Sequence, residues 1–378
     1  MPVVTNIDDL RTLSQKRIAK AIFDYVDRGS YSEATLRANR ADLESLTLRQ
    51  RVAVDVDRRS TRSTMVGQDV SMPVAIAPTG LTGLNWADGE MLGARAAERF
   101  GIPFTLSTMS ICSIEDVASV VTKPFWFQLY VMRDRGFAAS LIERAKAAGC
   151  SALVLTLDLQ VQGQRHQDIK NGLAVPPRLT PATFFDLVRK PGWVFNVLTG
   201  KRKSFGNLEG RIPNADSLTT LSQWIAGQFD PTLSWRDVEW VRKQWGGKII
   251  LKGILDAEDA KIAASTGVEA LVVSNHGGRQ LDGASSSIRA LPEVVDAVGS
   301  KIEVLFDGGI RSGQDVLKAL ALGARGTMIG RAFLYGLGAM GEKGVTRALE
   351  IIRSELDVTM ALCGLRDVKD ASPAILRA

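Results

Sequence analysis

Alternation of short apolar runs with amphipathic segments is the feature that most constrains the fold of this chain. From residue 74 onwards, eight such runs read PVAIAPTG, PFTLST, FWFQLYV, ALVLTLD, KIILKG, ALVVSNHG, EVLFDGG and GTMIG. Most are separated by segments with apolar residues at helical spacing, among them GEMLGARAAERFG, RGFAASLIERAKAAG and SGQDVLKALALG. Strands that alternate with helices predict βαβ crossovers and a parallel sheet.

Eight βα units in about 260 residues are typical of a (β/α)8 TIM barrel, an α/β fold. The alternative is a doubly wound open sheet, but the GxGxxG motif that often follows the first strand of such sheets is missing after APTG. We therefore expect residues 1–378 to form a single domain. An N-terminal helical segment (1–70, with one or two helices over 7–28) precedes the barrel (71–378), which carries a long insertion after strand 4 (about 170–232).

Charge and cysteine content exclude several classes of function. The net charge is +6, but there is no long basic tract and no interleaving of aromatic with basic residues, which argues against nucleic-acid binding. The excess of positive charge suits an anionic substrate, a phosphate-bearing cofactor or an acidic membrane surface. The three cysteines lie far apart without CxxC or Cys/His spacing, so we expect no metal site and a reducing compartment.

The insertion is the segment that bears on location. It contains PATFFDLVRKPGWVFNVLTGKRKSFGN, whose mixture of large apolar residues with Lys and Arg is typical of an interfacial segment. A lid, or a helix packed on the barrel, is the alternative. The sequence MPVVTNIDDLRTLSQKR does not resemble a secretory signal, and no run approaches the roughly 18 apolar residues of a transmembrane helix. We expect a cytoplasmic protein, or one bound peripherally to the cytoplasmic face of the inner membrane.

Polar or cationic residues follow the apolar interior of every predicted strand. Catalytic residues of a TIM barrel gather at the carboxyl ends of its strands, so we expect these residues to share one pocket mouth. In chain order, the residues at the strand ends include Ala77, Pro78, Thr79, Ser107, Thr108, Gln128, Tyr130, Thr156, Asp158, Lys252, Ser274, His276, Asp307, Gly309 and Gly330.

The sixth predicted strand leads into SNHGGRQLDG. A glycine-rich turn with an incidental histidine is one interpretation, and a base beside an anion clamp is the other. His276 has an ordinary pKa near neutrality and can act as a base, while Asp158 could orient its imidazole or serve only as a helix cap or structural ion pair. Arg165 and Arg279 are candidates for bidentate binding of a carboxylate. Lys252 could stabilise negative charge on a reduced cofactor, or be a surface lysine.

Two glycine–arginine pairs indicate a phosphate site. FDGGIRSG ends the seventh strand and MIGRAF the eighth, and the loops after these strands hold phosphate in many barrels. The glycines let backbone N–H groups approach an anion, and Arg311 and Arg331 would neutralise it. Either pair alone could be a turn with a surface arginine, but both together favour a phosphate-bearing cofactor or substrate.

Over nearly its whole length the chain resembles the FMN-dependent α-hydroxy-acid dehydrogenase and oxidase family. The specific signature SNHGGRQLD is intact, and IAPTG, FQLYV, LVLTLD, LKGI, FDGGIRSG and IGRAF also fit. Within that family, YVDRGSYSE, TLSTMSICSIE and QFDPTLSW resemble the bacterial L-lactate dehydrogenases that feed the respiratory chain.

The resemblance implies FMN as cofactor and a role for each residue. His276 would be the base, with Asp158 as its partner and Tyr130 bonded to the substrate hydroxyl. The substrate carboxylate would be held by Tyr25, Arg165 and Arg279. The isoalloxazine and ribityl parts would contact Ala77, Ser107, Gln128, Thr156, Lys252 and Ser274. The ribityl chain and phosphate would contact Asp307, Gly309, Arg311, Gly330 and Arg331.

The resemblance also implies oxidation of an L-2-hydroxy acid, most simply L-lactate to pyruvate, with electrons passed to quinone or cytochrome. An oxidase that uses oxygen and a mandelate-type dehydrogenase are the alternatives, and a homo-oligomer is expected. Met109 and Gly80 stand where glycolate oxidases carry tryptophan and alanine, which enlarges or softens the pocket, and the uncommon Gln162 leaves the exact substrate open. The intact base and clamp argue against a non-catalytic phosphate-binding barrel or an FMN isomerase.

Overall fold

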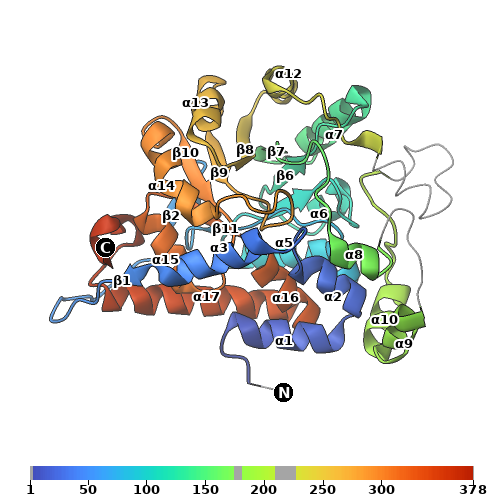
Figure 1. Cartoon of the computed structure of the whole chain (residues 1–378), viewed down its shortest axis with the longest axis horizontal. Helices are drawn as coiled ribbons and strands as arrows, with labels where there is room; N and C mark the ends of the chain where they lie inside the picture. Colours follow the sequence, from blue (N-terminus) through green and yellow to red (C-terminus); the bar gives the residue numbers. More distant parts are fainter. Residues whose placement is uncertain (1–2, 174–180, 209–226, 378) are drawn as a thin grey trace.

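The structure, a computed structural model, describes residues 3–173, 181–208 and 227–377. Its central sheet has eight parallel strands: β4 (Val74–Ile76), β5 (Thr105–Ser107), β6 (Trp126–Leu129), β7 (Ala152–Thr156), β8 (Lys248–Ile254), β9 (Ala270–Val273), β10 (Glu303–Phe306) and β11 (Gly326–Ile329). The strands follow one another in chain order, with β11 beside β4. These strands lie at the centre of the molecule (Figure 1). A parallel bridge between Ile76 and Phe104 closes the barrel. The predicted TIM barrel is confirmed.

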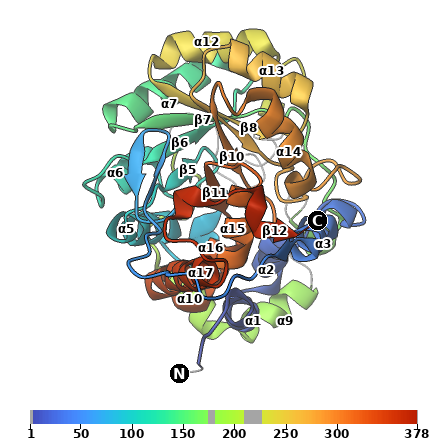
Figure 2. The same ribbon diagram turned by 90° about the vertical axis from the view of Figure 1, so that its left-hand side faces the viewer.

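Helices surround these strands (Figure 2). They are α5 (Gly89–Phe100), α6 (Ile114–Ala118), α7 (Arg135–Ala147), α12 (Trp235–Trp245), α13 (Ala257–Ser265), α14 (Ser287–Val298), α15 (Gly313–Ala321), α16 (Arg331–Met340) and α17 (Glu342–Leu362). Two short helices, α4 (Thr82–Asn85) and α8 (His166–Lys170), lie in the connections that follow β4 and β7.

Local sequence accounts for these elements. Every residue of β5, β6, β7, β9 and β11 is buried, as expected for parallel strands between a packed interior and covering helices. Capping boxes start several helices: Ser113 pairs with Asp116 at α6, and Ser312 with Asp315 at α15. Their side chains satisfy backbone N–H groups that the first turn leaves unpaired.

The N-terminal segment is helical only as far as Ser45. After α1 (Ile7–Arg17), α2 (Lys20–Asp27) and α3 (Ala34–Ser45), β1 (Thr47–Leu48) pairs with β12 (Leu376–Arg377), and β2 (Ser63–Met65) forms a hairpin with β3 (Gln68–Val70). The expectation of a helical segment over 1–70 is therefore wrong beyond Ser45. The reason is local, because Val66 and Gly67 have φ values of 50° and 70°, as the tight hairpin turn requires.

This hairpin packs into the barrel interior. Met65, Val66 and Val70 belong to the same buried cluster as inward-facing strand residues such as Trp126 and Met328. The hairpin fills one end of the barrel, and the cavity described below lies at the other end, where the strands reach their carboxyl termini.

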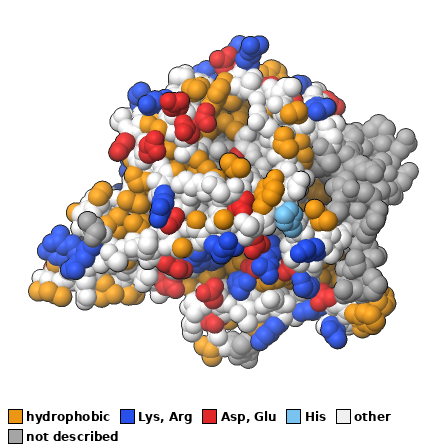
Figure 3. All heavy atoms as spheres, viewed as in Figure 1, with side chains coloured by type: hydrophobic (Ala, Val, Ile, Leu, Met, Phe, Trp, Pro, Cys, Tyr) orange, Lys and Arg blue, Asp and Glu red, His pale blue; other side chains and the backbone are white. Residues whose placement is uncertain are grey.

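The insertion contributes two helices at one edge of the molecule. α9 (Pro181–Val188) and α10 (Pro191–Thr199) lie beside α1 and α2 (Figures 1 and 2). Large apolar side chains gather on their outer face, at the lower right of Figure 3. Those at least 59% exposed are Phe184, Phe185, Val188, Phe195 and Leu198. Among the residues that the structure describes, no helix has the length and apolar character to cross a membrane.

Other contacts hold these two helices to the rest of the protein. The indole nitrogen of Trp193 donates to the Leu84 carbonyl oxygen at 2.9 Å. Arg202 forms ion pairs with Asp88 at 2.8 Å and Asp116 at 2.6 Å. One face of the pair is therefore docked, as the packed-helix interpretation expected, while the other face leaves apolar side chains in solvent.

Candidate active site

A cavity of about 300 Å³ opens at the carboxyl ends of the barrel strands. Most residues expected at the site line it: Tyr25, Ala77, Ser107, Tyr130, Arg165, Lys252, His276, Arg279, Asp307, Gly309, Arg311, Gly330 and Arg331. Three others, Gln128, Thr156 and Ser274, are buried at the ends of β6, β7 and β9. Asp158 does not line the cavity but contacts His276.

The turn after β9 explains the glycines of SNHGGRQLDG. His276 has a left-handed backbone with φ of 57°, which is costly for any residue but glycine. Gly277 and Gly278 continue the turn with φ values of 64° and 71°. A Cβ on Gly278 would lie 2.6 Å from the backbone nitrogen of Leu36 in α3. The tight turn, packed against α3, sets the imidazole in the cavity wall.

His276 forms a hydrogen-bonded pair with Asp158. Its Nδ1 lies 3.0 and 3.2 Å from the two carboxylate oxygens. Gly253 makes room for the carboxylate, because a Cβ there would lie 2.6 Å from the Asp158 Cβ. With Nδ1 donating to the carboxylate, Nε2 carries the basic lone pair.

The surroundings keep His276 neutral and Asp158 charged. Burial, helped by the positive charges of Lys252 and Arg165, lowers the pKa of His276 below its ordinary value of 6.5 and outweighs the opposing effect of Asp158. Burial alone would raise the pKa of Asp158, but His276 and Lys252 outweigh it and hold that pKa below its usual range. The ring is therefore an unprotonated base near pH 7.

Lys252 supplies a fixed positive charge. Its Nζ donates to the Ser274 hydroxyl at 2.8 Å and lies 3.0 Å from an Asp307 carboxylate oxygen. Burial favours the neutral amine, but Asp307 and Asp158 outweigh it and raise the pKa of Lys252. The surface-lysine alternative is wrong, because the side chain is only 5% exposed.

Two guanidinium groups lie over the ring of Tyr25, which α2 brings to the cavity. The central carbons of Arg279 and Arg165 lie 4.6 and 5.7 Å from the ring centroid. Burial, followed by the charge of Arg165, lowers the pKa of Arg279 to about 10, so it remains protonated at neutral pH. Two neighbouring cations and a phenol in one cavity wall suit a bound carboxylate.

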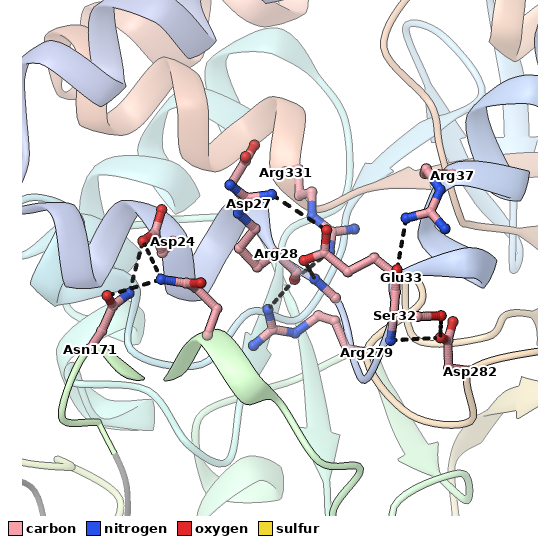
Figure 4. Close-up of polar contacts among 12 residues, drawn as sticks. Asp24, Asp27, Arg28, Ser32, Glu33, Arg37, Asn171, Arg279, Asp282 and Arg331 are labelled. Atoms are coloured by element: carbon pink, nitrogen blue, oxygen red, sulfur yellow. Dashed lines mark hydrogen bonds and ion pairs between the residues drawn. The ribbon is translucent and has the colours of Figure 1, made fainter. Parts of the chain in front are cut away.

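Arg279 and Arg331 also hold the N-terminal segment in place (Figure 4). Arg331 donates to the carbonyl oxygens of Val26, Gly277 and Arg28 at 2.8, 2.7 and 3.0 Å. Arg279 donates to the carbonyl oxygens of Tyr25 and Arg28. This role could not be predicted from the sequence, because backbone acceptors so distant in the chain leave no signal in a motif.

The ends of β10 and β11 form the polar part of the cavity. Arg311 lies over the Tyr335 ring at 5.0 Å, and Arg331 is the first residue of α16. A Cβ on Gly330 would meet nothing closer than Thr79 at 3.7 Å, so the backbone there is open to the cavity. A helix N-terminus beside two arginines suits a phosphate group.

Buried polar atoms provide a test of whether FMN fits this cavity. Gln128 Nε2, Thr156 Oγ1 and Asp307 Oδ1 have no hydrogen-bond partner among the described residues. Unpaired buried polar atoms are costly and indicate an additional polar partner. A flavin ring edge, ribityl hydroxyls and a phosphate offer the complementary groups, so the residues present fit FMN.

The cavity also has an apolar wall, which was not predicted from the sequence. The Phe229 ring lies edge-on to Tyr130 at a centroid distance of 6.1 Å. The insertion is expected to be an interfacial segment, a lid or a helix packed on the barrel, but it also supplies Leu173, Phe205 and Phe229 to the cavity. The apolar wall consists of Leu159, Leu173, Phe205, Phe229 and Met109. The departures Gly80 and Gln162 line the same cavity.

Fold and site together define a class: a TIM-barrel enzyme whose cavity brings together a neutral histidine paired with a carboxylate and several arginines suited to anionic groups. The comparisons with known proteins agree. The sequence profile described as FMN-dependent dehydrogenase matches residues 14–378. The chain belongs to this family, and FMN is its cofactor.

Relatives and solved structures match over almost the full chain. Identity is 45% to the L-lactate dehydrogenase of Caulobacter sp. (strain K31), covering 99% of this chain and 98% of that protein. It is 46% to the L-lactate dehydrogenase of Acinetobacter baumannii (strain AYE), covering 97% and 96%. The crystal structure of the monotopic membrane protein (S)-mandelate dehydrogenase superposes with a TM-score of 0.94 at 38% identity, covering 100% of both chains.

Proposed function

We propose that the protein oxidises a small L-2-hydroxy acid, most simply L-lactate to pyruvate, and passes the electrons to a membrane quinone or cytochrome. The observation that carries this proposal is the neutral His276, paired with Asp158, in the same cavity wall as Arg165 and Arg279. The names of the Caulobacter and Acinetobacter relatives support L-lactate as the substrate.

In this proposal the cationic clamp orients the substrate. Arg279 and Arg165 bind its carboxylate together with the hydroxyl of Tyr25, and Tyr130 bonds its hydroxyl group. His276 Nε2 accepts a proton from the substrate, and Asp158 stabilises the imidazolium that results. Burial raises the pKa of Tyr130, so its phenol stays protonated and can donate a hydrogen bond.

The remaining site residues would hold the cofactor. FMN supplies an acceptor for the two electrons that leave the substrate. Lys252 would place a positive charge where the reduced ring becomes negative. The ring and ribityl chain would contact Ala77, Ser107, Gln128, Thr156 and Ser274, and the ribityl chain and phosphate would contact Asp307, Gly309, Arg311, Gly330 and Arg331.

A mandelate-type dehydrogenase is the second candidate. The apolar wall around Met109 and Phe229, and the absence of a side chain at Gly80, leave room for a larger substituent than a methyl group. Anaerobic bleaching of the FMN absorbance, measured for L-lactate, glycolate and (S)-mandelate, decides between the substrates. Rapid reoxidation by oxygen alone would favour an oxidase, and no bleaching by any 2-hydroxy acid would refute the proposal.

The pKa of His276 predicts the pH dependence of flavin reduction. The base acts only when unprotonated, so the rate is full above its pKa and falls as the pH drops through it. Because burial lowers that pKa, we expect the acidic limb of kcat/KM to lie below pH 6.5. Stopped-flow reduction by L-lactate between about pH 5 and 8 measures this limb. A midpoint above neutrality would contradict a neutral resting histidine.

We also propose that α9 and α10 attach the protein peripherally to anionic lipid. Their exposed apolar side chains can enter the acyl boundary, while the exposed Arg189, Lys201 and Lys203 face anionic headgroups. Attachment would bring the flavin cavity near a lipid-dissolved quinone. The likeness to a monotopic membrane protein supports this location, which would be the cytoplasmic face of the inner membrane. We also propose that the protein forms a homo-oligomer.

Polar substitutions on this face should abolish attachment. We expect the double variant Phe185→Asp/Phe195→Asp to stay in the supernatant when anionic phospholipid vesicles are pelleted, whereas the unchanged protein pellets and is partly released by high salt. Val358→Asp removes an apolar side chain that is 53% exposed on α17, and this variant should still pellet. All three proteins should be reduced by L-lactate at the same rate. Pelleting of the double variant would contradict the assignment of this face.

A further inference from the structure

Residues 205–208 of the insertion, here called the anchor segment, contact the barrel. Leu208 is buried in the main core, and the Gly206 N–H donates to the Ile111 carbonyl oxygen at 3.1 Å. A Cβ on Gly206 would lie 2.6 Å from the backbone nitrogen of Ser113. The anchor segment is therefore pressed directly against the connection between β5 and α6.

Asn207 makes the polar contacts of this junction and is completely buried. Its Nδ2 lies within hydrogen-bonding distance of the carbonyl oxygens of Ser107 and Thr108, at 3.2 and 3.4 Å, and of the Ser110 hydroxyl oxygen at 3.0 Å. Its Oδ1 accepts from the Ile114 N–H at 2.9 Å. One side chain thus spans the whole connection from the end of β5 to the start of α6.

The residues held in this way form part of the cavity. Ser107 and Met109 line it, and so does Phe205 from the anchor segment itself. The Ser107 hydroxyl donates to Gln128 Oε1 at 3.1 Å and accepts from the Met109 N–H at 3.1 Å. The path from Asn207 to the expected flavin contacts, Ser107 and Gln128, therefore consists of direct hydrogen bonds between buried groups.

We propose that Asn207 is a positioning residue for the reaction: it fixes the β5–α6 connection and Phe205, and thereby couples the insertion to the flavin and substrate wall of the cavity. This inference rests on the proposed function of the cavity. Without the amide, the buried carbonyl oxygens of Ser107 and Thr108 lose the donor that Asn207 supplies, although Ser107 still accepts from the Ser110 N–H at 3.2 Å. The connection then shifts, and Met109 and Phe205 move with it.

The variant Asn207→Asp separates positioning from mere stability. Its carboxylate still accepts from Ile114 and gains charge attraction to Arg144, whose Nη2 lies 3.5 Å from Oδ1. It donates nothing to Ser107 and Thr108 and repels their carbonyl oxygens. The control is Asn196→Ala in α10, where Oδ1 accepts from the Ala87 N–H at 2.8 Å and ties the same insertion down elsewhere.

The holoenzyme and both variants are compared by the visible flavin spectrum, the Kd for FMN, the melting temperature and stopped-flow reduction by L-lactate. Loss of the buried amide donor of Asn207 is expected to raise the KM of Asn207→Asp for L-lactate about tenfold, with a smaller change in kcat. The flavin bands should also shift. Because attraction to Arg144 offsets part of the repulsion from the carbonyl oxygens, the melting temperature of Asn207→Asp should fall less than that of Asn207→Ala. Asn196→Ala should keep the KM and the spectrum unchanged.

An unchanged KM and flavin spectrum in Asn207→Asp would overturn the proposal, and so would equal defects in Asn196→Ala. Asn207→Ala adds a further check, because it keeps neither oxygen nor amide. A kinetic defect in the two Asn207 variants that simply follows their loss of melting temperature also counts against positioning. Failure of L-lactate to bleach the unchanged protein would instead refute the proposed function, while the spectrum and the Kd for FMN would still test Asn207.

Discussion

Replacing His276 with glutamine is expected to slow anaerobic reduction of the flavin by L-lactate by about 10²- to 10⁴-fold, with FMN still bound. Glutamine can occupy similar space and hydrogen-bond to Asp158, but its amide does not accept a proton near neutral pH. Positioned general bases typically contribute factors of this size. Stopped-flow absorbance gives the rate, and the visible spectrum before mixing gives the bound FMN.

The chain offers a matched control in its other histidine. His166 is exposed and packs edge-on against Tyr31 at 5.7 Å. His166→Gln should therefore reduce its flavin at the rate of the unchanged protein. Near-normal reduction of His276→Gln would show that another group removes the proton. Loss of FMN from that variant would show that the imidazole supports the cofactor instead.

Arg279→Lys should weaken lactate binding roughly 10- to 100-fold and slow flavin reduction as well. Lysine keeps the charge but loses the planar fork that binds a carboxylate through two parallel hydrogen bonds. A charge-assisted hydrogen bond contributes about 1.5–3 kcal/mol, which corresponds to this range of affinity. Lysine also cannot lie flat over Tyr25 while it donates to the carbonyl oxygens of Tyr25 and Arg28.

The dependence of the reduction rate on lactate concentration measures this effect. Arg37→Lys is the control, because Arg37 makes an exposed hydrogen bond to the Ser32 carbonyl oxygen in the same N-terminal region. It should bind lactate normally. An unchanged apparent Kd for lactate in Arg279→Lys would show that Arg279 does not bind the carboxylate, and Arg165 would be the next candidate.

The order of strands and helices could be predicted because it depends on local pattern. Each apolar run is buried on both faces, and each ends where polar residues begin. The helix starts at Ser113 and Ser312 likewise depend on residues three positions apart. The hairpin over 63–70 was missed because three-residue strands are too short for the alternation of apolar and polar residues to be recognised.

The sequence by itself determined the barrel, the family and the identity of the strand-end residues. The reason is that a barrel built from consecutive βα units brings the carboxyl ends of all its strands to the same side. The resemblance implied that Asp158 is the partner of His276, but only the tertiary structure decided the distance between them, because that distance depends on how β7 and β9 lie beside β8. It also decided that Arg279 and Arg331 hold the N-terminal segment, that Phe205 lines the cavity, and that Asn207 holds the adjoining β5–α6 connection. These contacts join backbone and side-chain atoms far apart in the chain, and only packing brings such atoms within hydrogen-bonding distance.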